Sequence, residues 1–174
     1  MIFLELYHLR HAQRIGKNPH ISEEGLKKAQ EIGKNLPTFD TVLSSASIRS
    51  IETTIAMGYA ITDTIDFKDA VPKVASTEEE QQGFDTFIGY FHSINNSPYF
   101  KEFNTNLVTL LTNKLSPYKS NDRILLVSHG GVIETSTIGF LPSLNYSEWG
   151  SNVIHCHGVK LLFKDGKCIS GEKI

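Results

Sequence analysis

The segment Arg123-Ile-Leu-Leu-Val-Ser-His-Gly-Gly131 decides the fold class of this 174-residue chain. Its first six residues have a continuous apolar centre, which is typical of a strand buried on both faces in a parallel sheet. The glycine pair then opens a predicted helix that continues to about Leu141 and ends at Pro142. A buried strand that leads directly into a helix is the repeating unit of α/β proteins.

The same order of strand and helix recurs upstream of this segment. A strand is expected over 2–9, and Ser22 is the expected N-cap of a helix that ends before Pro37. A second strand covers 40–43, and a helix follows from Ile48. A third, short strand lies near 65–67. The chain therefore predicts a three-layer αβα sandwich with a mainly parallel central sheet, in a single domain over 1–174.

The remaining segments are expected to cover and complete that sheet. Helical stretches are predicted from Pro72 to about Ile94 and from 98 to 118, and they would cover the crevice that holds the substrate. Strands are expected over 153–156 and 159–163, with Asp165-Gly166 as a hairpin turn.

Composition excludes several classes of function. The chain is 40% hydrophobic and 21% charged, as in soluble globular proteins, and its net charge of −2 opposes a general affinity for nucleic acid or an anionic membrane. It shows no signal peptide or membrane-spanning stretch, and its two cysteines suit a reducing compartment, so we expect a cytoplasmic protein. Any anion site must come from a local group of cations.

The residues that follow three of the predicted strands form such a group. Arg10-His11 follows the first strand, Ser44-Ser45 and then Arg49 follow the second, and His129 with Gly130 follows the late strand. Ligands of open α/β sheets bind beyond the carboxyl ends of the strands. Guanidinium groups bind phosphate oxygens in pairs, and a neutral imidazole can attack phosphorus. These residues therefore predict a site for a phosphoryl group.

Phosphoryl transfer also needs an acid that protonates the leaving oxygen. The run Glu78-Glu79-Glu80 is the obvious supply of such a carboxyl group. The residues by themselves do not choose among its three members.

Four blocks of the sequence resemble motifs of the histidine phosphatase (phosphoglycerate mutase-like) superfamily, in the order of that family. They are Leu9-Arg-His-Ala-Gln13, Ser22-Glu-Glu-Gly25, Leu43-Ser-Ser-Ala-Ser-Ile-Arg-Ser-Ile-Glu-Thr-Thr54 and Val127-Ser-His-Gly-Gly-Val-Ile133. The resemblance implies that His11 is the nucleophile that becomes phosphorylated. It also implies that Arg10, Arg49 and His129 bind the phosphoryl oxygens. The family often has a glutamate four residues before a glycine, so the resemblance also implies Glu79, four residues before Gly83, as the proton donor, with Glu78 and Glu80 as alternatives.

The chain also departs from the family pattern. Ala12 stands in place of the signature glycine, Glu52 in place of a common glutamine, and Lys17 where an asparagine often occurs. The His155-Cys-His157 stretch does not provide the three or four ligands that zinc needs, so it is read as a half-exposed strand, and neither metal nor cofactor is expected.

The expected activity is metal-independent hydrolysis of a phosphomonoester, either a small phosphorylated metabolite or a phosphohistidine protein. Phosphoglycerate mutase activity is a less favoured hypothesis, because the chain is short and lacks the longer inserts of such enzymes. A non-catalytic phosphate-binding or interaction module on the same fold is the alternative from a different class.

Overall fold

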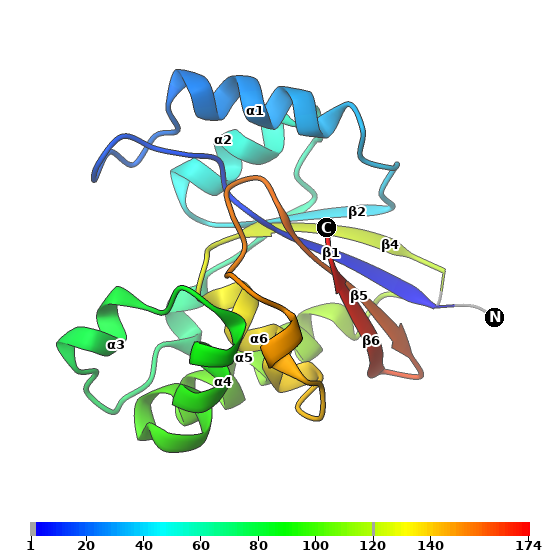
Figure 1. Cartoon of the computed structure of the whole chain (residues 1–174). Coiled ribbons are helices and arrows are strands. Elements are labelled where there is room, and N and C mark those ends of the chain that lie inside the picture. Colours follow the sequence, from blue (N-terminus) through cyan, green and yellow to red (C-terminus); the bar gives the residue numbers. More distant parts are fainter. Residues whose placement is uncertain (1–2, 120) are drawn as a thin grey trace.

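A computed structural model describes residues 3–119 and 121–174, except for the side chain of Glu79 (Figure 1). Among these residues, six strands form one sheet in the order β3-β2-β4-β1-β5-β6. The strands are β1 (Leu4–Arg10), β2 (Thr41–Ser45), β3 (Asp63–Ile65), β4 (Arg123–Ser128), β5 (Gly158–Lys164) and β6 (Lys167–Lys173). Strands β1 to β4 are parallel to one another, and β5 and β6 form an antiparallel edge. The predicted mainly parallel sheet is confirmed.

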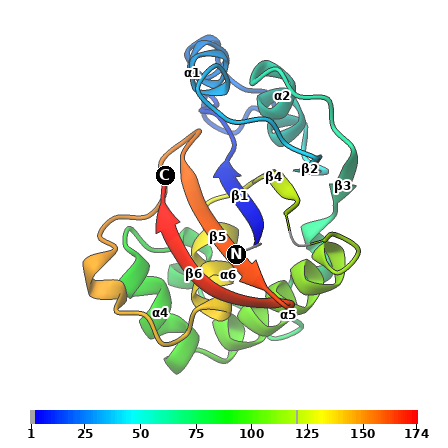
Figure 2. The same ribbon diagram turned by 90° about the vertical axis from the view of Figure 1, so that its right-hand side faces the viewer.

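Helices cover both faces of this sheet. They are α1 (Glu23–Gly33), α2 (Ile48–Ala56), α3 (Glu78–Gln82), α4 (Phe87–Asn96), α5 (Pro98–Leu115) and α6 (Val132–Phe140), with short 3₁₀ helices η1 (Phe67–Ala70) and η2 (Tyr146–Glu148). In Figure 1, α1 and α2 lie on one side of the sheet, and α4, α5 and α6 lie on the other. The view turned by 90° shows the same three layers (Figure 2). No helix among the described residues is long and apolar enough to span a bilayer.

The central strand β4 builds both halves of the core. Ile124 and Leu126 belong to the larger apolar cluster, which packs against α4, α5 and α6. Leu125 and Val127 belong to the smaller cluster on the side of α1 and α2. All four side chains are fully buried, since successive residues of a strand point to opposite faces and both faces are covered. Burial of each stabilises the fold by roughly 1.5–3 kcal/mol.

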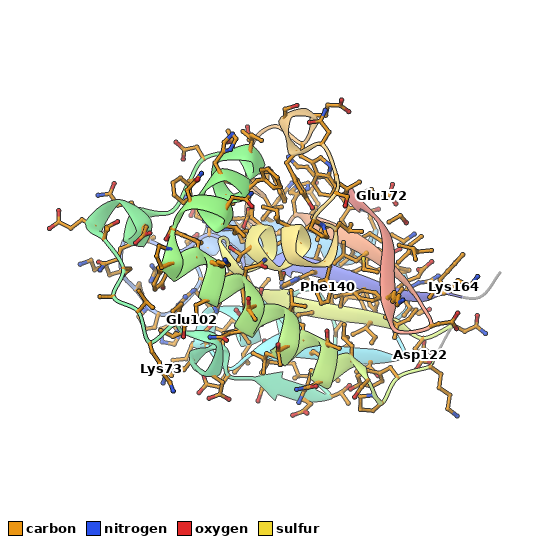
Figure 3. All side chains as sticks on the ribbon, turned by 90° about the horizontal axis from the view of Figure 1, so that it is seen from below. Lys73, Glu102, Asp122, Phe140, Lys164 and Glu172 are labelled. Atoms are coloured by element: carbon orange, nitrogen blue, oxygen red, sulfur yellow. The ribbon has the colours of Figure 1, made fainter. Side chains whose placement is uncertain are left out.

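Figure 3 shows, from below, the face of the sheet that α4, α5 and α6 cover. Two contacts on this side join elements that are distant in sequence. Phe140 at the end of α6 packs edge-to-face on Phe163 of β5, with ring centroids 5.1 Å apart. The backbone N–H of Lys73 donates to Oε1 of Glu102 on α5 at 3.1 Å. These contacts fix the sheet edge and the connection that leads to α3.

The helix expected from Pro72 to Ile94 is instead broken into α3 and α4, so this prediction was wrong. Gly83 ends α3 with φ of 75°, a left-handed conformation that interrupts a right-handed helix. The chain then starts again at Thr86, whose Oγ1 accepts from the N–H of Gly89 at 3.2 Å. Helix α1 ends at Gly33, before Pro37 as predicted, and the N–H groups of Asn35 and Leu36 donate in turns to the carbonyls of Ile32 and Gly33.

The strand expected over 153–156 is absent, and the chain there forms a loop around the end of β1. The N–H of Cys156 donates to the carbonyl of Arg10, and the N–H of Arg10 donates to the carbonyl of His157. Cys156 itself has φ of 64°, which no strand tolerates. The turn at Asp165-Gly166 is confirmed, and it leads into the edge strand β6, whose largely exposed residues gave no hydrophobic alternation to predict it from.

Candidate active site

Three strand ends meet at one edge of the sheet, as the sequence predicted. Arg10 lies level with Ser128 in the pairing of β1 and β4, and the N–H of His11 donates to the carbonyl of Ser128 at 2.9 Å. Strand β2 pairs with the other side of β4 and brings the first turn of α2 to the same edge. The structure therefore places His11, His129 and Arg49 together.

His11 is held in a form suited to nucleophilic attack. Its Nδ1–H donates to the carbonyl of Ala12 at 2.8 Å, so the lone pair lies on Nε2, which accepts from Nε of Arg49 at 3.0 Å. Burial lowers the pKa of His11 to about 3; the bond to Ala12 opposes this shift, and the nearby charges of His129 and Arg49 add to it. The imidazole is therefore neutral near pH 7, as attack on phosphorus requires.

His129 forms the opposite wall of the site. Its ring centroid lies 5.3 Å from that of His11. Its Nδ1 accepts from a terminal nitrogen of Arg49 at 3.2 Å, and its Nε2–H donates to Oγ of Ser45 at 2.8 Å. Burial and the charges of Arg49 and Arg10 lower the pKa of His129 to about 4. Two neutral imidazoles thus flank a guanidinium that bonds to both.

Arg10 lies beside this group and packs against the glycine loop that follows β4. Its Nη1 donates to the carbonyl of Val153 at 2.9 Å, and its Nε is buried without a partner among the described residues. A Cβ atom on Gly130 would lie 3.1 Å from the Arg10 Cζ, which is tighter than most real contacts. A side chain at this position would therefore push the guanidinium away by a few tenths of an ångström.

The three candidate acids differ in what the structure assigns to them. Both oxygens of Glu80 are used: Oε2 accepts from the N–H of Thr77 at 2.7 Å, and Oε1 accepts from the hydroxyl of Ser97. These bonds hold the pKa of Glu80 below its ordinary value, which makes it a poor proton donor. Glu78 is exposed. The backbone of Glu79 lies in α3, and its side chain is outside the described part of the structure.

Three residues for which the sequence predicted no specific role also contribute to the site. Ser45 bonds to His129, and the ring of His155 lies 5.7 Å from that of His11. The charge of Arg14 contributes, after burial, to a lowered pKa of Arg49. The sequence did not indicate His155, because its segment is predicted as a strand. The doubled serine of the third motif, Leu43 to Thr54, was a usable signal for Ser45.

Two departures from the family pattern have simple structural explanations. Ala12 is buried, its φ is not positive, and its N–H donates to Oγ1 of Thr53 at 2.8 Å, so a glycine is not needed there. The carboxylate of Glu52 accepts from the ring of His20 and from the N–H of Ile21, and it thereby anchors the loop before α1. Both of its oxygens are thus engaged away from the His11 ring.

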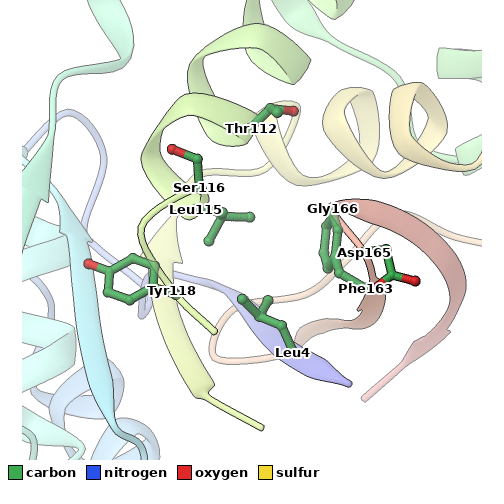
Figure 4. A pocket seen from close by; sticks show the side chains of 8 residues that line it. All are labelled: Leu4, Thr112, Leu115, Ser116, Tyr118, Phe163, Asp165 and Gly166. Carbon is green, nitrogen blue, oxygen red and sulfur yellow. The ribbon is translucent and has the colours of Figure 1, made fainter. Parts of the chain in front are cut away.

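Two cavities lie beside residues of the site. A cavity of about 340 Å³ lies between the end of α3 and Gly130-Gly131, and one of about 250 Å³ lies between Ser45 and Phe67. Other cavities lie away from the site, among them one of about 180 Å³ at the amino end of the sheet between Leu115 and Phe163 (Figure 4). That end of the sheet is opposite to the catalytic candidates.

Solved structures with the same fold include several enzymes. A phosphoserine phosphatase from Entamoeba histolytica, in complex with 3-phosphoglyceric acid, is similar with a TM-score of 0.69 and 20% identity over 95% of this chain and 94% of that one. A phosphoglycerate mutase from Bacillus anthracis has a TM-score of 0.64 and 20% identity over 99% and 93%. A mycobacterial glucosyl-3-phosphoglycerate phosphatase has a TM-score of 0.66 and 16% identity over 97% and 96%. These likenesses confirm the predicted fold.

Family membership rests on a separate comparison. The chain matches none of the curated protein sequences with which it was compared. The family model "Histidine phosphatase superfamily (branch 1)" matches residues 6–169, a range that contains all four motifs and every residue of the site described above. The chain therefore belongs to branch 1 of the histidine phosphatase superfamily.

Proposed function

We propose that the protein hydrolyses phosphomonoesters without a metal ion, through a phosphohistidine formed on Nε2 of His11. The observation that carries this proposal is the orientation of His11: its Nδ1 bonds to the backbone, and its neutral Nε2 faces Arg49 at 3.0 Å. A binding module would need the arginines, but it would not need an imidazole presented in this way.

In the first step, the lone pair of Nε2 attacks phosphorus as the bond to the ester oxygen breaks. The guanidinium of Arg49, now bonded to both imidazoles, turns its N–H groups to the phosphoryl oxygens together with Arg10. Positive charge there stabilises the negative charge that develops on the equatorial oxygens. A carboxyl group of α3, assigned here to Glu79, gives its proton to the leaving oxygen.

In the second step, the carboxylate left on α3 takes a proton from water as that water attacks phosphorus. The bond between phosphorus and Nε2 breaks, inorganic phosphate leaves, and His11 returns to its neutral form. The acid of the first step thus becomes the base of the second, and each turnover restores the site. The substrate would be a small phosphorylated metabolite or a phosphohistidine protein.

The proposal is tested by hydrolysis of 4-nitrophenyl phosphate and a panel of metabolites in the presence of EDTA, with wild type and His11→Ala. We expect turnover by the wild type and a loss of at least about 1,000-fold in the variant, as when a nucleophile is removed. Absence of turnover on every substrate would favour the non-catalytic module. Turnover that survives in His11→Ala would contradict the phosphohistidine intermediate.

The assignment of Glu79 predicts a dependence on the leaving group. Glu79→Gln should slow alkyl phosphates by roughly 100-fold or more, because general acid catalysis contributes about 100- to 10,000-fold. Hydrolysis of 4-nitrophenyl phosphate should be slowed much less, since its leaving group needs little protonation. Glu78→Gln and Glu80→Gln are the matched controls, and a larger leaving-group effect in either would move the acid to that residue.

A further inference from the structure

The cavity of about 340 Å³ beside the site has a composition that selects a kind of leaving group. The residues that define its walls are Tyr90, Tyr99, Phe100 and Phe103 from α4 and α5, with Gly130-Gly131 on the side of the site and Glu80 to Gly83 at the rim. Its apolar wall is thus made of aromatic rings. A cavity of about 150 Å³ is already enough to accept benzene, so this one has room for a ring with substituents.

This cavity adjoins the expected phosphate position. Gly130, which forms one of its edges, packs against the guanidinium of Arg10. The helix α3, which carries the candidate acids, forms another edge. Because the acid must reach the leaving oxygen, the leaving group lies on the side of α3.

The charge of the cavity also limits which leaving group it can bind. Among its described lining residues, Glu80 is the one with a charged side chain, and neither lysine nor arginine contributes to the walls. Burial, together with the negative charge of Glu80, raises the pKa of the Tyr99 hydroxyl. A carboxylate in this space would lose hydration without gaining a cation, and it would be repelled by Glu80.

From these observations, and resting on the proposed function, we infer that the leaving group is an uncharged ring-bearing alcohol, an aryl or arylmethyl group, without a carboxylate on the ring. The rings of Tyr99 and Phe103, whose centroids are 6.1 Å apart, offer a stacking surface to such a group. Phosphate esters that carry a carboxylate on this ring would be poor substrates.

The cavity of about 250 Å³ on the other side of His129 leads to the opposite expectation. Its lining includes Lys68 and Asp66 beside Phe67, so a carboxylated leaving group that extended there would meet a cation. The two cavities can therefore be distinguished by the response to one added carboxylate.

The experiment measures Kd by calorimetry for benzylphosphonate and 4-carboxybenzylphosphonate, which bind without being hydrolysed. We expect the carboxylate to weaken binding by at least about 10-fold. Gln82→Lys, which adds a cation at the exposed rim of the cavity, should reduce that difference, whereas the neutral control Gln82→Met should leave it unchanged. Equal or tighter binding of the carboxylated ligand by the wild type would overturn the inference. A preference for it that disappears in Lys68→Met would place the leaving group in the other cavity instead.

Turnover of phenyl phosphate and 4-carboxyphenyl phosphate separates this inference from the proposed function. The carboxylate makes the phenol a slightly better leaving group, so a lower kcat/KM for that ester must come from its placement in the site. If neither ester is hydrolysed while the phosphonates keep the expected order, the hydrolytic function fails and the leaving-group site stands. If both esters are hydrolysed equally well, the leaving-group site fails and the hydrolytic function stands.

Discussion

At the scale of single residues, the site depends on histidines that stay neutral. His11 and His129 are buried beside arginines, and the pKa values of both imidazoles are lowered, to about 3 and about 4. A free histidine would be largely protonated at pH 5, since its ordinary pKa is about 6.5. Protonation would take the lone pair from Nε2 of His11 and set a positive charge against Arg49. Burial therefore preserves the lone pair that the proposed attack on phosphorus needs.

The lowered pKa values predict how the rings of His11 and His129 titrate in the protein without ligand. At pH 5, ¹⁵N NMR should show neutral imidazoles for His11 and His129, with the proton on Nδ1 of His11 and on Nε2 of His129. A short unstructured peptide that contains histidine is the reference, and it should be mostly protonated at that pH. A charged His11 ring at pH 5 would contradict the assignment of the neutral nucleophile.

Gly130 predicts an effect that acts through Arg10. A Cβ atom there would lie 3.1 Å from both Cζ and Nε of that arginine, so Gly130→Ala should displace the guanidinium. We expect competitive inhibition by inorganic phosphate to weaken by roughly 10-fold, or about 1.4 kcal/mol. Combining Gly130→Ala with Arg10→Ala gives the control, because the two effects should not add if they share one cause. Additive effects would show that Gly130 acts independently of Arg10.

At the scale of elements, helix α6 connects two loops of the site through Glu134. This carboxylate is fully buried, and it accepts from the N–H of Gly131 at 2.6 Å and from the N–H of Val153 at 2.8 Å. The carbonyl of Val153 in turn accepts from Arg10. One side chain thus ties the loop after β4 to the loop that precedes β5, and both loops contact Arg10.

Substitution of Glu134 tests this connection. Glu134→Gln places an amide NH₂ against a backbone N–H, and one buried donor loses its acceptor. We expect the free energy of unfolding to fall by about 1–3 kcal/mol and the KM to rise more than kcat falls, because Arg10 loses its support. Urea unfolding and steady-state kinetics measure both quantities. The exposed Glu31→Gln on α1 should change stability by less than about 0.5 kcal/mol. An unchanged KM in Glu134→Gln would restrict this residue to a role in stability.

At the scale of the whole molecule, the buried histidines connect stability to pH. His8 lies fully buried under the site, where its Nε2 bonds to Oγ of Ser128 at 2.6 Å, and burial lowers its pKa to about 3. In the unfolded chain the pKa of each histidine is near 6.5. Between that value and about 4, the unfolded chain therefore binds more protons than the folded one. The free energy of unfolding falls as the pH is lowered through this range.

The slope of that dependence is measurable. Each histidine that stays neutral contributes up to about 1.4 kcal/mol per pH unit between pH 6 and pH 4. His8→Gln should reduce the slope found by urea unfolding at a series of pH values, whatever its effect on stability at pH 7. Gln30→Ala, at an exposed position without a titratable group, is the control and should leave the slope unchanged. An unaltered slope in His8→Gln would show that His8 takes up a proton in the folded state.

The sequence by itself determined the features that depend on local pattern. The apolar run of β4, the cap at Ser22 and the residues after three strands were sufficient to predict the sheet, its layers and the grouping of Arg10, His11, Arg49 and His129. Parallel strands end at one edge, so residues that follow them must meet. Tertiary structure decided what depends on distant partners and on burial. The helix is broken at Gly83, and residues 153–157 fold around Arg10. Tertiary contacts also bring His155 and Ser45 to the site and engage a carboxylate oxygen of Glu80 in a hydrogen bond with Ser97. Tertiary structure also kept His11 neutral, because only the packed fold removes water from that imidazole.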